Sequence, residues 1–275
     1  MNPIPVPTSP LWLGADADPA WRRLWRREPR LVAFAALMLA CTAPSALGLA
    51  LDERTLREVS VWVKPMKFMA STAMLALTTA WFAALLPEPV RRGPAFTALV
   101  WTLIATAGFE VAYISFQAAL GQDSHYNVGT PFHAAMYSLM GTAAVVLTAT
   151  QPWLAWLIWR HGRRGVAPAY RLAVLLGLVL TFVLGAGAGI MLGGGSPAPG
   201  PGLPVLGWSR VAGDLRAAHF VGIHAAQVLP LIGFALASWR PRAALTGVWL
   251  AAAAWSALWA AVLLQALAGR PLIGL

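Results

Sequence analysis

LAVLLGLVLTFVLGAGAGIML, the stretch Leu172–Leu192, decides the fold, because none of its 21 residues is charged. A helix rises 1.5 Å per residue, so this stretch crosses the roughly 30 Å hydrocarbon core of a bilayer. Because lipid offers no hydrogen-bond partner, a segment of this length must satisfy its own backbone. The stretch is therefore expected to be a transmembrane helix, and Gly185 and Gly189 within it predict close packing against a neighbouring helix.

Six further apolar segments have a similar length and few charges. They are Leu31–Leu51, Met66–Leu86, Ala95–Leu120, Phe132–Trp159, Ala217–Trp239 and Ala243–Leu267. We expect an all-α, polytopic helical bundle of about seven spans, in which Pro152 kinks or ends the fourth span. The expected organisation is a start over residues 1–30, a membrane domain over 31–269 and a short outer tail over 270–275.

The composition excludes most soluble classes. Only 11% of the residues are charged and 59% are apolar, whereas soluble domains carry about 25% charged residues. The net charge of +10 would suggest a nucleic-acid partner, but the basic residues fall in short segments between the spans. Thirteen of them lie on the side of the N-terminus and seven on the other. This asymmetry predicts a cytoplasmic N-terminus and no nucleic-acid binding.

The N-terminal segment predicts contact with a membrane surface. Met1–Pro10 is Pro-rich and lacks the basic and apolar regions of a cleaved signal, so we expect the first span to stay in the protein. After Asp18, Trp21 and Trp25 share one helical face and arginines take the other. Such a helix is expected to lie on anionic lipid at the inner face of the bilayer.

Glu110 is the single acid inside an expected span. An ionisable group at this depth costs about 2.5 to 3.5 kcal/mol, so it should face the bundle interior. Tyr113 and Gln117 follow at i+3 and i+7 and extend a polar stripe toward the outer side. Two interpretations stay open: an interhelical hydrogen bond that fixes packing, or an acid that accepts a proton or binds a ligand.

Three histidines lie near the outer ends of expected spans: His133 starts the fourth, and His219 and His224 lie in the sixth. Imidazoles at one depth can ligate haem or a transition metal, and Glu110 would then act as a proton acceptor or support the ligands. Gln117 and Gln227 are candidate cofactor-binding residues beside them. The alternative is that these histidines only make hydrogen bonds near the interface, since the five-residue spacing of His219 and His224 is unusual for two ligands.

Lys64 and Lys67 flank Pro65 at the outer start of the second span. Long basic side chains at a helix end usually extend to the lipid headgroups. They could also hold an anionic headgroup, or pair with Asp123 or Asp214.

Several strings of the chain are distinctive together: Trp62–Phe68, Ser124–Asn127, Thr130–Phe132, Gly213–Arg216, His219–Phe220 and His224–Pro230. They resemble the strings of a family of bacterial integral membrane proteins of unknown activity. The resemblance implies a multi-pass protein of the bacterial inner membrane and implies no particular reaction.

These observations predict an integral membrane protein with an outward-opening polar pocket of His and Glu side chains that binds haem or a metal ion. One alternative is a transporter or receptor for a small solute, a proton or a lipid. Another is an accessory subunit without a ligand, for which Trp249, Trp255 and Trp259 would form a contact surface for a protein partner or a second copy. The sequence does not decide whether the protein is an enzyme.

Overall fold

A computed structural model describes residues 19–56, 58–195, 200–203 and 206–274. Met1–Pro10 and Asp18, which carried part of the N-terminal prediction, lie outside the described residues. Apart from one short hairpin, the regular structure of the described chain is helical. The all-α bundle predicted from the apolar segments is confirmed.

The structure divides at residue 165 into a first and a second group of elements. The first group consists of α1 (Ala20–Arg27), α2 (Pro29–Leu51), β1 (Thr55–Leu56), β2 (Val59–Ser60), α3 (Val63–Ala83), α4 (Glu88–Arg91), α5 (Pro94–Ala119) and α6 (Pro131–His161). The second consists of α7 (Pro168–Leu180), η1 (Thr181–Ala186), α8 (Gly187–Gly193), α9 (Leu215–Ile223), α10 (Ala225–Trp239) and α11 (Ala244–Leu267).

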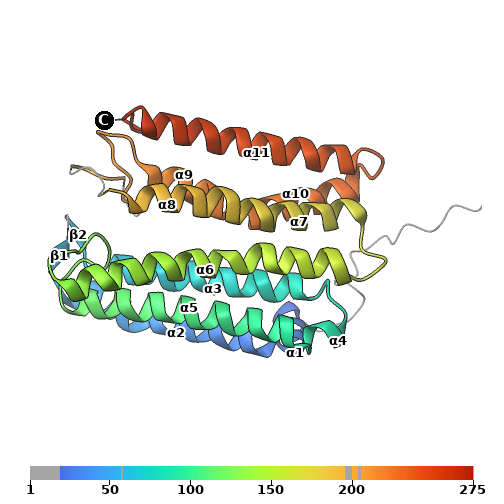
Figure 1. The fold of residues 1–275 in the computed structure, drawn as a ribbon, viewed down its shortest axis with the longest axis horizontal. Helices are drawn as coiled ribbons and strands as arrows, with labels where there is room; N and C mark the ends of the chain where they lie inside the picture. The colour runs from blue at the N-terminus through green and yellow to red at the C-terminus, as the bar shows by residue number, and fades with distance from the viewer. Residues whose placement is uncertain (1–18, 57, 196–199, 204–205, 275) are drawn as a thin grey trace, which may run out of the picture.

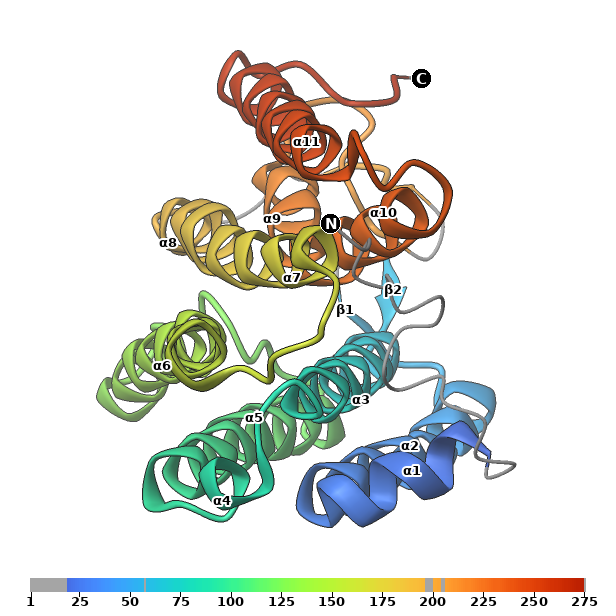
Figure 2. The ribbon, with the colours of Figure 1, turned by 90° about the vertical axis from the view of Figure 1, so that its right-hand side faces the viewer.

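These groups form the two halves of a bundle of roughly parallel and antiparallel helices, stacked one on the other, as Figure 1 and the end view in Figure 2 show. We call α1–α6 the first layer and α7–α11 the second layer. The end of the bundle with the hairpin and the loop 120–130 is called the outer end, and the end with α1 and α4 the inner end. These names follow the orientation expected from the charges.

Five helices of the described chain are long and apolar enough to cross a membrane: α2, α5, α6, the continuous helix Pro168–Gly193 and α11. A sixth candidate is the pair α9 and α10, which is bent by 45°. The second expected span corresponds to α3, which is 21 residues long but begins with Lys64 and Lys67 and carries several hydroxyl side chains. The chain is thus compatible with a membrane protein of five or six spans, and the seventh stays an expectation.

Helix breaks lie side by side in the second layer. The π-helical turn η1 follows α7, and α9 ends at Ile223 before α10 begins. The Thr181 hydroxyl lies 2.9 Å from the backbone nitrogen of Ala226, from which it accepts a hydrogen bond, and 3.4 Å from the Ile223 carbonyl. This hydroxyl therefore satisfies backbone groups that the break releases. Pro152, by contrast, does not end its helix, since α6 continues to His161.

Candidate functional site

At the outer end of the first layer, polar side chains of α3 and of the loop after α5 meet. We call Lys64 of α3 with Ser124 and His125 of this loop the outer polar cluster; Glu110 and Gln117 lie on α5, which leads into the loop. The Nζ atom of Lys64 lies 3.2 Å from Nδ1 of His125, and the Ser124 hydroxyl lies 3.2 Å from the same nitrogen. The cluster thus joins residues that are 61 positions apart in the chain.

His125 receives a hydrogen bond from Lys64. An ammonium group can only donate, so Nδ1 must be the acceptor and the ring proton of a neutral imidazole sits on Nε2. Burial lowers the pKa of His125 from 6.5 to about 3, and the charge of Lys64 acts in the same direction. The imidazole therefore stays neutral at physiological pH and positions the ammonium group.

Glu110 lies in the middle of α5 with only 5% of its surface exposed. Its Oε1 atom is buried and accepts no hydrogen bond from any described residue. Lys64 is close enough for its charge to act on the carboxyl group. A buried carboxyl in this setting can be held either as an ion or as a neutral acid.

Gln117 continues the same face of α5 two turns above Glu110. Its side chain is fully buried, and Nε2 donates a hydrogen bond of 2.6 Å to the Tyr113 hydroxyl. Its Oε1 atom is also buried without a donor among the described residues. Two buried acceptor oxygens thus lie on one helix face, where a proton, a water or a donor group could be bound.

Two tyrosines connect the cluster to the second layer. Tyr126 has a φ of +61°, a left-handed conformation that is unusual for a bulky residue. Its hydroxyl donates to the Leu192 carbonyl at 2.9 Å, and the Tyr137 hydroxyl donates to the Gly193 carbonyl at 2.8 Å. The Tyr137 ring also meets the His125 ring edge-on, with centroids 6.2 Å apart. These contacts hold the loop against the end of α8.

The structure does not gather His133, His219 and His224 into a metal site. Within the described residues, no group of three or more His, Cys, Asp or Glu side chains could hold a metal ion. Each ring is held locally through Nδ1: His133 by the Thr130 hydroxyl at 2.8 Å, His219 by the Gly185 carbonyl at 2.8 Å, and His224 by the Phe220 carbonyl at 2.7 Å. Haem ligation stays a prediction that an absorption spectrum of the purified protein would test.

The other expected site residues lie apart from the outer polar cluster. Gln227 joins the layers, since its Nε2 atom donates to the Thr78 hydroxyl at 3.4 Å. The Nζ atom of Lys67 lies 3.5 Å from the Leu206 carbonyl.

Asp214 caps α9 and forms an ion pair of 2.6 Å with Arg216. Burial alone would raise the pKa of Asp214, but hydrogen bonds from Arg216 and Ser209 outweigh it and lower the pKa below its ordinary value.

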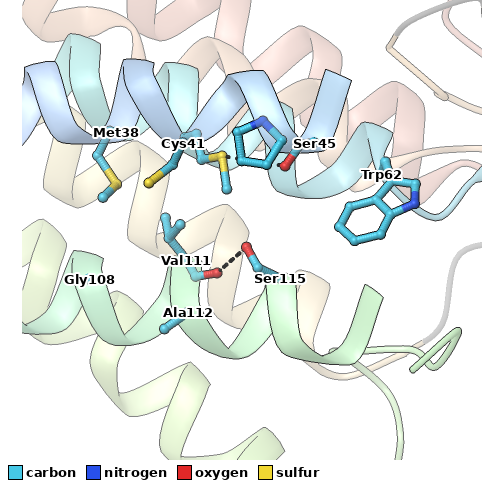
Figure 3. Close-up of a pocket in the computed structure, with 10 residues that line it drawn as sticks. Met38, Cys41, Ser45, Trp62, Gly108, Val111, Ala112 and Ser115 are labelled. Atoms are coloured by element: carbon cyan, nitrogen blue, oxygen red, sulfur yellow. Dashed lines mark hydrogen bonds between the residues drawn. The ribbon is translucent and has the colours of Figure 1, made fainter. Parts of the chain in front are cut away.

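A cavity of about 370 Å³ lies on another side of α5, against α2 and α3. Figure 3 shows Cys41 and Ser45 of α2 facing Gly108, Ala112 and Ser115 of α5 across it. The Ser115 hydroxyl donates to the Val111 carbonyl of its own helix at 2.7 Å, so the lining is apolar in effect. None of the predicted site residues lines this cavity.

The tryptophans of α11 do not form one open surface. Trp249 is 57% exposed, but the ring nitrogens of Trp255 and Trp259 are buried. Trp255 packs against Leu229 and Ala252 inside the second layer. A protein-contact role for all three is therefore not favoured by their placement.

The sequence did not single out His125 as a partner of Lys64. A signal existed, because Lys64 and Phe68 belong to one of the strings that carry the family resemblance and His125 belongs to another. The His125 ring lies beside Phe68 as well, with centroids 6.1 Å apart. Comparisons with protein-family models, with curated proteins and with solved structures find no match to the chain.

Proposed function

We propose that the chain is a multi-pass protein of the bacterial inner membrane that binds and releases a proton at Glu110 from the outer side. The observation that carries this proposal is the buried Oε1 atom of Glu110, which has no hydrogen-bond donor among the described residues and lies within reach of the Lys64 charge.

The surroundings of Glu110 support a proton-binding role over a purely structural one. A structural interhelical hydrogen bond would need a donor on a neighbouring helix, whereas no described residue donates a hydrogen bond to Oε1. Lys64 joins α3 to His125 of the loop 120–130, and its charge acts on the Glu110 carboxyl. A small solute that donates hydrogen bonds could use the same acceptors, Glu110 and Gln117, and would then bind together with the proton.

The geometry favours binding over conduction across the bundle. Toward the inner end, the hydroxyl-bearing residues of α5 that follow Glu110 are Thr106, Thr102 and Thr97. The Thr106 hydroxyl donates to the Thr102 carbonyl at 2.7 Å and is thus used within its own helix. The proposed role is that of a receptor whose ligand binding is linked to proton binding, or of a transporter whose proton-binding site opens to the outer side.

Proton counting tests the proposal. The purified protein, in unbuffered detergent solution with a pH-indicator dye, is shifted from mildly acidic to mildly alkaline pH. We expect Glu110→Gln to release one proton fewer per chain than the unmodified protein, because glutamine keeps the shape but cannot ionise.

Glu88→Gln is the matched control. Glu88 lies exposed in α4 and pairs with Arg92 at 2.7 Å, so its loss should leave the proton count in this range unchanged. Equal counts for the unmodified protein and Glu110→Gln, with both folded, would overturn the proposal.

A further inference from the structure

A second cavity, of about 500 Å³, opens at the inner end of the first layer. It lies where α1 meets α2 on one side and where α4 leads into α5 on the other, at the near end of the bundle in Figure 2. Its lining is mostly charged and includes Arg26, Arg27, Arg30, Arg91 and Arg92. This cavity is separate from the outer polar cluster, so a ligand bound here does not depend on the proposed function.

Arg30 and Arg92 form ion pairs with glutamates in the cavity wall. Arg30 forms a bidentate pair with the buried Glu28, at 2.7 and 2.9 Å. Arg92 pairs with Glu88 at 2.7 Å. The lining thus contains five arginines and two glutamates among the described residues, which gives it a net surplus of three positive charges.

Arg91 lies among these charges. Its guanidinium group donates to the Leu86 carbonyl at 2.6 Å and is partly buried. Burial lowers the pKa of Arg91, and the charges of Arg163 and Arg27 lower it further, although Glu88 and Glu28 act in the opposite direction. Cations held this close in the fold favour the binding of an anion that would relieve their repulsion.

The position of the cavity selects the kind of anion. It lies at the inner ends of α2 and α5, two of the candidate spans. Trp21 and Trp25 of α1 are 60% and 48% exposed beside it, and such aromatic residues are typical of the headgroup level of a bilayer. The planar guanidinium group of arginine can donate two parallel hydrogen bonds to the oxygens of a phosphate group.

We propose that this cavity binds the phosphate of an anionic phospholipid from the leaflet on the side of the N-terminus. The phosphate accepts hydrogen bonds from the arginines of α1 and α4, and the acyl chains leave the cavity along the lipid-facing surface. A bound lipid would hold α1 and α4 together across the ends of α2 and α5.

The experiment uses the full chain in nanodiscs of phosphatidylcholine with increasing phosphatidylglycerol, and it measures lipid retention by native mass spectrometry. The test variant is Arg26→Gln/Arg27→Gln. We expect its affinity for phosphatidylglycerol to fall roughly five-fold per arginine, or about 25-fold in total. The unmodified protein should retain phosphatidylglycerol in preference to phosphatidylcholine.

Arg240→Gln/Arg242→Gln is the matched control, since it removes two positive charges from the loop between α10 and α11 at the same end of the bundle (Figure 1). It should retain the lipid as the unmodified protein does. Arg91→Gln is a second test variant, and circular dichroism checks that it folds despite losing its bond to Leu86. Arg91→Gln should weaken the retention of phosphatidylglycerol at least as much as a single arginine substitution in α1.

Three results would overturn the proposal. Retention that is equal in the test variants and the unmodified protein would exclude the cavity as the site. An equal loss in the control variant would show that surface charge alone attracts the lipid. Saturable binding of inorganic phosphate or glycerol phosphate in pure phosphatidylcholine nanodiscs, without a preference for phosphatidylglycerol, would assign the cavity to a soluble phosphate compound instead.

Discussion

The two layers of the bundle use glycine in different ways. In the second layer, a Cβ atom on Gly222 of α9 would lie 2.6 Å from the backbone nitrogen of Gly185, so these helices meet backbone to backbone. In the first layer, a Cβ atom on Gly108 of α5 would find only Phe34 within contact, at 3.9 Å. The contact between α9 and η1 is therefore closely packed, whereas the contact between α2 and α5 leaves room for a cavity.

The more open contact lies in the layer that holds the cavities. Both described cavities and the outer polar cluster lie in the first layer. Membrane helices pack tightly where small residues let backbones approach, and polar groups survive there only with partners. A layer that carries a site must accept looser contacts between its helices.

The largest effect is expected from adding a methyl group to the close-packed layer. Gly222→Ala forces α9 away from η1, because the nearest atoms are backbone atoms that cannot turn aside. We expect the free energy of unfolding to fall by roughly 3 kcal/mol, measured by denaturant titration in detergent. An unchanged stability would show that the second layer is as loose as the first.

Lys64→Met is expected to have the next largest effect, since it leaves Glu110 without its nearby positive charge. The loss should be roughly 2 kcal/mol in the free energy of unfolding. Adding Glu110→Gln should recover much of this loss, because the neutral amide needs no counter-charge. Additive effects of the two substitutions would mean that Lys64 and Glu110 do not interact.

Acidification should weaken the outer end through His125. The unfolded imidazole takes up a proton below about pH 6.5, whereas the folded one does so only near its pKa of about 3. Stability is therefore greatest above pH 6.5 and is lost as the pH falls through this window, by roughly 1–2 kcal/mol at about pH 5. Thermal unfolding across this pH range should show the slope, and His125→Gln should reduce it.

The smallest effect is expected from Gly108→Ala, the counterpart of Gly222→Ala in the looser layer. The new methyl group enters open space beside Phe34, and alanine favours a helix over glycine. The free energy of unfolding should rise by about 0.5–1 kcal/mol in the same titration. A loss as large as that of Gly222→Ala would remove the contrast between the layers.

The sequence predicted the features that depend on local patterns. The apolar segments predicted the helical bundle, and Gly185 and Gly189 predicted close packing, which the 2.7 Å approach of Ile223 to a Cβ position on Gly185 confirms. The burial of Glu110 also follows from its place in an apolar stretch. Each of these predictions depends only on residues that lie near one another along one helix.

The features that the sequence did not predict depend on contacts between distant segments. Pairing of Lys64 with His125 requires the turn at Tyr126 and the approach of α3 to the loop 120–130. His133 and His219 were expected at similar depth as possible ligands, but each imidazole is held by a hydroxyl or carbonyl group, and the Gly185 carbonyl that holds His219 lies 34 positions away in the chain. The basic cavity likewise needs α1 and α4 to meet at the same end.

Infrared difference spectroscopy tests the central claim, proton binding at Glu110, most directly, because the C=O stretch of a protonated carboxyl is distinct from that of a carboxylate. We expect a protonated-carboxyl band that changes between mildly acidic and mildly alkaline pH in the unmodified protein and is absent in Glu110→Gln. A spectrum without such a band, or one whose pH-dependent band persists in Glu110→Gln, would contradict proton binding at this residue.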